Sequence, residues 1–115
     1  MFNFEKLTVW HRALAFAGAS YRLSASFPHT ERFGLTNQIR RAATSIASNL
    51  AEGSARPKAD FAKFIGYING SLCDVITQAA IARDQGYVGP DAYSQLYRDA
   101  DEISRMLSGL RKSLE

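Results

Sequence analysis

The sequence is poor in the residues that build disulfide frameworks and metal sites. Cys73 is the only cysteine, and His11 and His29 are the only histidines. A lone cysteine cannot form a disulfide within one chain, and a zinc site would lack thiolate ligands. The Glu-x-x-His pairs that hold di-iron centres in helix bundles are also absent. We therefore expect no metal and no cofactor, and we interpret Cys73 as a small packing residue.

Long apolar runs and catalytic motifs are missing as well. No apolar run approaches the roughly 18 residues that span a membrane. The N-terminal MFNFEKLTVWHRA mixes charges with apolar residues, unlike a signal peptide. These absences predict a cytoplasmic protein without a membrane partner. There is no phosphate-cradling glycine loop, helix-turn-helix or zinc finger. Glu52 and Asp74 could form an acid pair, but such pairs are commonly structural, so we predict that the protein is not an enzyme.

The composition indicates a folded domain with a mildly basic N-terminal half. Apolar residues make up 46% of the 115 residues and charged residues 22%, which is typical of one domain covering residues 1–115. Residues 1–63 hold nine Lys or Arg against four Asp or Glu, whereas residues 64–115 hold five against seven. This surplus is compatible with nucleic acid or an acidic partner, although an ordinary solvated surface is the simpler interpretation of the charge alone.

Apolar residues recur every three or four positions through most of the chain, which predicts four amphipathic helices. They cover about residues 8–26, 31–52, 59–85 and 91–113, separated by FPHT, GSARPK and GYVGP. Thr8 and Thr30 are the expected N-caps, Gly53 is an expected left-handed C-cap, and Gly86 ends the third helix. Short connections favour antiparallel neighbours, so the predicted fold is an all-α, up-down-up-down four-helix bundle.

Each predicted helix has a stripe of core residues. The first carries Trp10, Leu14, Ala17 and Tyr21, widened by Val9, Phe16 and Leu23. The other three stripes are Leu35, Ile39, Ala42/Ala43, Ile46 and Leu50; Phe61, Ile65, Ile68, Leu72, Val75/Ile76 and Ala79; and Tyr93, Leu96/Tyr97, Ala100, Ile103, Leu107, Leu110 and Leu114.

Polar residues gather on one flank of the second and third helices at about 100° per residue. Two antiparallel helices could bring these flanks together in a partly buried hydrogen-bonded network that fixes their register. Charges would come from Arg41, Glu52 and Asp74, and Ser45, Asn49 and Ser71 would bridge them. A solvated polar flank is the alternative interpretation. The predicted network comprises Gln38, Arg41, Ser45, Asn49, Glu52, Ser71 and Asp74, with Tyr67 and Gln78 on the same flank.

The opposite faces of the same two helices carry small, uncharged side chains where Lys and Glu would be usual. Two mid-helix glycines cost about 1 kcal/mol each relative to alanine. Such faces suit close helix approach between subunits, so we predict a homo-oligomer. Its expected contacts are Thr44, Ser48, Gly66, Gly70, Cys73 and Thr77.

Basic residues off the core faces are the candidate contacts to nucleic acid. Arg56 and Lys58 flank Pro57 in an exposed loop, a suitable place to meet phosphate. In a ring each cation would repeat around the axis and the fields would add. Without a sequence-reading motif, binding would be directed at the backbone and sensitive to salt. The candidates are Arg40, Arg56, Lys58, Lys63, Arg12 and Arg22.

A multi-part pattern in FPHTERFGLTNQIRRAATSIASNLAEG and GYINGSLCDV resembles the four-helix-bundle proteins encoded in intervening sequences of bacterial 23S ribosomal RNA genes. One departure is Asp74, where the family pattern leads us to expect Glu. Trp10 and Gly86-Tyr87 also fit the pattern. Its matched positions are Pro28, Glu31, Phe33, Gly34, Leu35, Gln38, Arg41, Ala42, Ser45, Ile46, Asn49, Glu52, Gly53, Gly70, Ser71 and Leu72.

The resemblance implies a four-helix bundle that assembles as a homopentamer and has no catalytic residues. Related accessory variability proteins of diversity-generating retroelements form a barrel-like pentamer that binds nucleic acid and a reverse transcriptase. Three functions follow for this chain: RNA or DNA binding without sequence readout, a protein-interaction adaptor for a polymerase-type partner, or a purely structural bundle.

Overall fold

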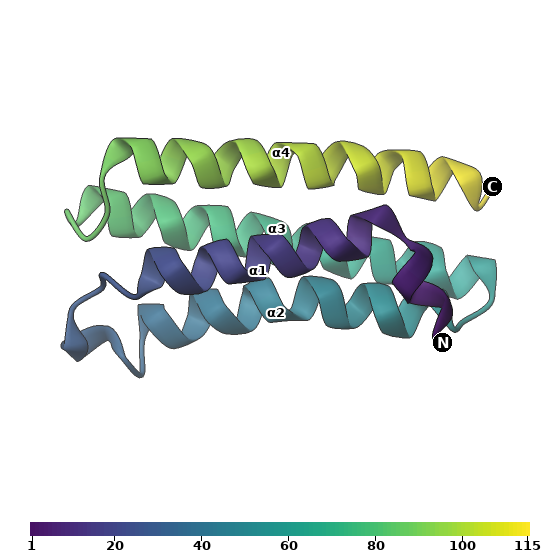
Figure 1. The fold of residues 1–115 in the computed structure, drawn as a ribbon, viewed down its shortest axis with the longest axis horizontal. Helices are drawn as coiled ribbons and strands as arrows, with labels where there is room; N and C mark the ends of the chain where they lie inside the picture. Colours follow the sequence, from purple (N-terminus) through teal and green to yellow (C-terminus); the bar gives the residue numbers. More distant parts are fainter.

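Four long helices and two short 3-10 helices make up the fold, in a computed structural model that describes all 115 residues. The long helices are α1 (Thr8–Ser24), α2 (Leu35–Ser54), α3 (Lys58–Asp84) and α4 (Pro90–Ser113). The short ones are η1 (Asn3–Lys6) and η2 (His29–Glu31). The predicted all-α four-helix fold is confirmed (Figure 1). None of these helices has the length and apolar character that crossing a membrane requires.

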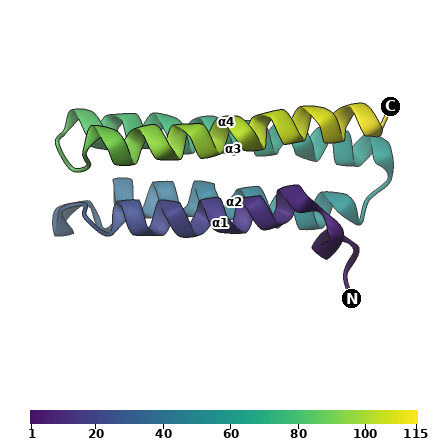
Figure 2. The same ribbon diagram turned by 45° about the horizontal axis from the view of Figure 1, so that its top comes forward.

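Successive helices run in opposite directions, so the bundle has the predicted up-down-up-down order. Each helix packs against two others: α1 against α2 and α4, and α3 against α2 and α4. The bundle measures 43 × 23 × 22 Å. Figures 1 and 2 show both termini and the α2–α3 connection at one end, and the α1–α2 and α3–α4 connections at the other.

The core stripes predicted for the last three helices lie inside the bundle. In α2 and α3 the fully buried large side chains include Ile39, Ile46, Leu50, Ile65 and Ile68. In α4 the buried side chains are Leu96, Ala100, Ile103 and Leu107, while Tyr97 is 53% exposed. These sequences alternate large apolar and polar residues at helical spacing, which leaves one orientation that buries the apolar face.

The core face of α1 follows the prediction only in part. Val9 and Phe16 are buried as predicted, and Trp10, Ala17 and Leu23 pack against the core. Leu14 and Tyr21 are exposed, and the residues before them, Ala13 and Ser20, are buried in their place, with Ser24 continuing the stripe. Serine can lie inside because each hydroxyl donates to its own helix: Ser20 Oγ to Phe16 O at 2.9 Å and Ser24 Oγ to Tyr21 O at 3.1 Å.

Gly53 lies inside α2 and is not the left-handed C-cap that was predicted. It is buried, and its helix continues to Ser54. A Cβ at this position would lie 2.8 Å from Phe64 Cβ and 2.9 Å from Phe61 Cδ1. Glycine is therefore required for the close approach of α2 to the first turns of α3. The positive φ angle occurs at Gly86, at 79°, just after α3 as predicted.

The start of α2 is capped by a carboxylate, and neither predicted threonine cap forms. Thr8 is the first residue of α1 and makes no cap bond, while Thr30 lies in η2. Glu31 Oε1 accepts a hydrogen bond from Leu35 N at 3.2 Å. Its second oxygen, Oε2, accepts from Tyr87 Oη at 3.1 Å. This bond, with partial burial and the nearby negative charge, raises the pKa of Tyr87. Glu31 thus joins the two connections at this end of the bundle.

Candidate functional site

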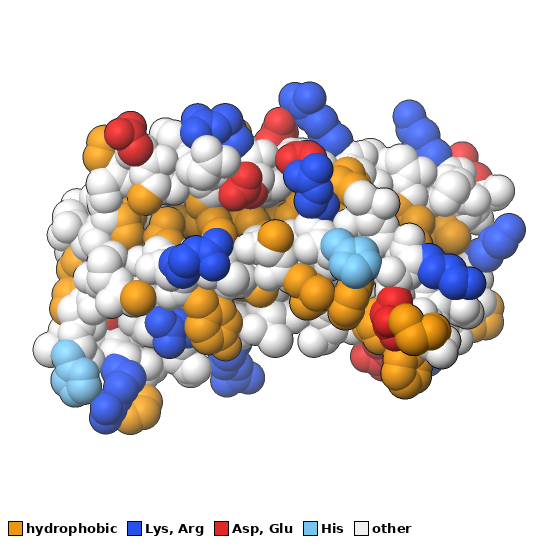
Figure 3. All heavy atoms as spheres, in the orientation of Figure 1, with side chains coloured by type: hydrophobic (Ala, Val, Ile, Leu, Met, Phe, Trp, Pro, Cys, Tyr) orange, Lys and Arg blue, Asp and Glu red, His pale blue; other side chains and the backbone are white.

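The six predicted nucleic-acid contacts do not form one patch. Arg12 Nη1 lies 2.7 Å from Glu102 Oε1 and so joins α1 to α4. Arg12 and Arg22 both line a groove of about 180 Å³ between α1 and α4, and Asp99 and Glu102 line it as well. Both α1 arginines therefore face carboxylates. Figure 3 shows Lys and Arg scattered over this face of the bundle, with acidic side chains interleaved along α4.

The cations at the α2–α3 connection are more accessible. Lys58 and Lys63 are exposed on the first turns of α3, and neither forms an ion pair with a carboxylate. Arg56 pairs with Glu52 one turn earlier at 3.1 Å, and its guanidinium lies 5.5 Å from the centre of the Phe64 ring. Two free lysines and one exposed, loosely paired arginine therefore stand at this end of the bundle.

Arg40 was predicted as a nucleic-acid contact, but its guanidinium is bonded to α1. Its Nε donates to Ser24 Oγ at 2.8 Å, and its Nη2 donates to Tyr21 O at 3.3 Å. The guanidinium also lies 4.7 Å from the centre of the Tyr21 ring, within cation–π range. Arg40 is half-buried and joins α2 to the end of α1. It adds a further donor to the last turn of α1 and also lies at the surface.

Arg41 is the exposed arginine of this pair. No Asp or Glu lies within salt-bridge distance of its guanidinium. It opens onto a groove of about 540 Å³ along the outer face of α2, which we call the α2 groove. Both arginines line this groove and no carboxylate does, so it attracts anions. Its lining residues are Tyr21, Asn37, Arg40, Arg41, Thr44, Ser45, Ser48 and Asn49.

The predicted polar network exists only at its centre. A hydrogen bond of 2.7 Å between Ser45 Oγ and Ser71 Oγ joins α2 to α3, and Asn49 Nδ2 donates to Ser45 O at 2.9 Å. All three residues are half-buried. The outer members were predicted wrongly: Gln38, Arg41, Glu52 and Asp74 are exposed, and Glu52 bonds Arg56 instead. A long charged side chain can place its charged group in water, whereas the short serine side chain stays at the contact between α2 and α3.

The small side chains predicted as subunit contacts are all exposed. Gly66, Gly70, Cys73 and Thr77 follow the outside of α3. A Cβ at Gly66 or Gly70 would have no neighbour within 4 Å, so nothing within the chain requires glycine there. Thr44 and Ser48 are also exposed, and they line the α2 groove beside the arginines. Contact with a second subunit at these six residues stays a prediction.

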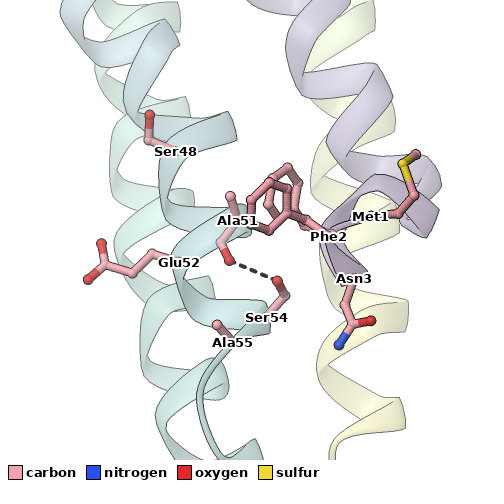
Figure 4. Close-up of a pocket in the computed structure, with 9 residues that line it drawn as sticks. Met1, Phe2, Asn3, Ser48, Ala51, Glu52, Ser54 and Ala55 are labelled. Atoms are coloured by element: carbon pink, nitrogen blue, oxygen red, sulfur yellow. Dashed lines mark hydrogen bonds between the residues drawn. The ribbon is translucent and has the colours of Figure 1, made fainter.

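A second groove, of about 690 Å³, lies between the N-terminal segment and the last turns of α2. Figure 4 shows the Phe2 ring extending from that segment toward Ala51, and Ser54 Oγ donating to Ala51 O at 2.8 Å. Ser48 lines this groove and also the α2 groove. The one acidic residue that lines this second groove is Glu52, which is paired with Arg56. The groove is therefore mainly an apolar surface.

The residue types that ligate metals are dispersed over the molecule. No group of three or more His, Cys, Asp or Glu residues is arranged to hold a metal ion. Cys73 is exposed on α3, so its predicted packing role would need a second subunit. The sequence interpretation missed Tyr21, which it assigned to the core and which is 46% exposed in the α2 groove.

Comparisons with known proteins find one matching family and a similar solved structure. A model of the 23S rRNA-intervening sequence protein family matches residues 5–109. The fold also matches the crystal structure of a protein of unknown function from the S23 ribosomal protein family of Bacteroides thetaiotaomicron. That match has a TM-score of 0.83 and 22% sequence identity, and covers 91% of this chain and 99% of the other. No curated protein matches the chain at a significant level.

Proposed function

This chain belongs to the 23S rRNA-intervening sequence protein family, and we propose that it is a non-enzymatic, homo-oligomeric bundle that binds RNA or another nucleic acid without reading its sequence. The observation that carries the proposal is the α2 groove. It holds two arginines and several hydroxyl and amide groups but no carboxylate. Arginine, hydroxyl and amide groups are the usual contacts to phosphate oxygens.

Four of the other arginines are less available to a phosphate than Arg41. Arg12, Arg56, Arg83 and Arg105 each pair with a carboxylate at 2.7 to 3.1 Å. A phosphate would have to compete with those carboxylates, whereas Arg41 has no such competitor. Lys58 and Lys63 form a second, weaker anchor at the α2–α3 connection. We expect the protein to act in the cytoplasm, where RNA is available.

Salt-dependent RNA binding tests the proposal. Wild-type protein should bind a labelled RNA at about 50 mM salt and lose affinity steeply toward about 200 mM, because binding releases counterions from the phosphates. Arg41→Ala should weaken binding and flatten the salt dependence. Arg105→Ala is the matched control, because Arg105 is exposed but pairs with Asp101 on α4. Absence of binding by the wild type at about 50 mM would refute the proposed function.

Assembly through the outer face of α3 completes the proposal and leaves Thr44 and Ser48, the other two predicted subunit contacts, to line the α2 groove. Mid-helix glycine costs about 1 kcal/mol relative to alanine, and neither Gly66 nor Gly70 meets an intramolecular neighbour that would explain it. A helix of a neighbouring subunit, packed closely on this face, would explain why glycine occurs at both positions. The family resemblance leads us to expect five subunits.

Light scattering at micromolar concentration tests the assembly. Wild type should be oligomeric, and Gly70→Arg should dissociate it. Gly109→Arg is the matched control, since Gly109 is an exposed glycine on α4 that also has no neighbour within 4 Å. A monomeric wild type would rule out the oligomer. Equal dissociation by both variants would reject the α3 face as its contact.

The exposed aromatic side chains favour a second candidate function, an adaptor for a polymerase-type protein. Tyr67 is 62% exposed and Tyr97 is 53% exposed, and exposed tyrosines are common anchors in protein interfaces. The same RNA assay separates the two functions. An adaptor, or a purely structural bundle, would show no RNA binding at any salt concentration and no effect of Arg41→Ala.

A further inference from the structure

The α2 groove carries an aromatic surface as well as positive charge. Tyr21 contributes a ring that is about half exposed, at 46%. Arg41 supplies a guanidinium without a carboxylate partner, and Thr44 and Ser48 add hydroxyl groups. Phosphate binding accounts for the arginine and the hydroxyl groups. It gives no role to an exposed ring, which favours a ligand with a flat apolar part beside its phosphate.

Arg40 holds that ring in place. Its guanidinium lies 4.7 Å from the centre of the Tyr21 ring, while its Nε is bonded to Ser24 Oγ, a group on a buried residue. Its Nη2 also bonds Tyr21 O. The guanidinium plane and the ring are therefore fixed together before any ligand binds. Nucleobases stack on both kinds of surface, and prior ordering lowers the entropic cost of binding.

We propose that the α2 groove binds single-stranded nucleic acid, with a phosphate on Arg41 and an unpaired base stacked against Tyr21 and Arg40. A duplex keeps its bases stacked on one another and presents its phosphates in rows, so it could not use the ring. Unpaired bases can turn outward onto an aromatic side chain. This assignment rests on the proposed nucleic-acid function and specifies the form of nucleic acid.

Fluorescence anisotropy with two probes tests the assignment. One probe is a labelled 12-nucleotide RNA without self-complementarity, and the other is the same RNA annealed to its complement. The wild type should bind the single strand more tightly. Tyr21→Leu should weaken that binding about five- to hundredfold, the usual effect of losing one base–aromatic stack, and leave duplex binding unchanged. Tyr97→Leu is the control, because Tyr97 is comparably exposed but lines a different groove beside Cys73.

Two further variants separate stacking from charge and from folding. Tyr21→Phe keeps the ring and should bind like the wild type, which shows that any loss in Tyr21→Leu comes from the ring. Arg41→Ala should reduce the slope of log K against log salt by about 0.7 per chain for a single strand.

The outcomes distinguish this inference from the proposed function. Equal affinity for both probes, with no effect of Tyr21→Leu but a loss in Arg41→Ala, would overturn single-strand binding and keep phosphate binding. Free UMP binding as tightly as the 12-mer would also overturn it, since the ligand would then be a nucleotide. No binding of either probe at about 50 mM salt would remove the proposed function itself.

Discussion

Gly53→Ala should destabilise the protein, although alanine is the better helix former. Within a helix the substitution favours folding by about 1 kcal/mol. Here the new Cβ would lie 2.8 Å from Phe64 Cβ and 2.9 Å from Phe61 Cδ1. Phe64 Cβ is held close to the backbone and Phe61 is buried, so α2 and α3 must separate. Overpacking of this kind costs about 3 kcal/mol at the upper end of its usual range. The net loss is therefore about 2 kcal/mol.

Thermal unfolding measures this loss against a matched control. A chain of this length unfolds with an entropy near 0.24 kcal/mol/K, on the order of 2.1 cal/mol/K per residue. Gly53→Ala should then lower Tm by about 8 °C. Gly109→Ala is the same substitution at an exposed position of α4 with no neighbour, and it should raise Tm by about 4 °C. If Gly53→Ala melts at or above the wild-type temperature, close helix approach is not what glycine provides.

Two further predictions concern hydrogen bonds between helices and connections. Ser45→Ala should lower the free energy of unfolding in urea by about 1 kcal/mol, because it leaves the half-buried Ser71 without its 2.7 Å partner. The double variant Ser45→Ala with Ser71→Ala should lose less stability than the two single variants added together. Strict additivity would show that the bond contributes nothing. The Glu31 carboxylate raises the pKa of Tyr87, so this contact should stabilise the fold below the ordinary tyrosine pKa of about 10 and be lost as pH rises through the higher folded value. Unfolding followed from about pH 8 to pH 11 should show this loss in the wild type but not in Tyr87→Phe, and parallel profiles would contradict it.

The sequence predicted three of the four helix orientations because α2, α3 and α4 have one apolar face each. In α1 apolar or small residues occur on most sides, so periodicity alone allowed two faces one residue apart. The structure buries the face with Ala13 and Ser20 and leaves Leu14 45% exposed. Small residues permit close packing, and serine hides its hydroxyl in its own helix. Serine counts as polar in a hydropathy pattern, so the larger apolar side chains Leu14 and Tyr21 were predicted for the core in place of Ala13 and Ser20.

Helix ends were predicted less well because caps depend on contacts between distant residues. Glu31 caps α2 from a preceding turn and is held by Tyr87, 56 residues later. Gly53 followed Glu52 in a pattern typical of a C-cap, yet its conformation is helical and its requirement comes from Phe61 and Phe64 on the next helix. Local propensity contains none of these long-range contacts.

For the network on the α2–α3 flank, the sequence predicted which side of each helix the residues occupy but not how deeply they are buried. Helical geometry places a residue on a flank, and this was sufficient for the bonded pair of Ser45 and Ser71. It does not say how far a side chain extends. Arg41 and Asp74 stand on the expected flank, but both are exposed and neither forms an ion pair. The charged residues were predicted in a partly buried network, whereas their side chains extend into solvent.

The orientation of α1 also determines what the α2 groove can bind. With the predicted core face, Tyr21 would fill the bundle, and the groove would offer cations and hydroxyl groups alone. In the structure Ser20 is buried in its place and Tyr21 lies at the groove, where Arg40 fixes its ring. The two arginines thereby take opposite roles to those expected, since Arg40 orders the surface and Arg41 is left to meet a phosphate. Stacking on Tyr21 is therefore the property that would distinguish this groove from a generally basic surface.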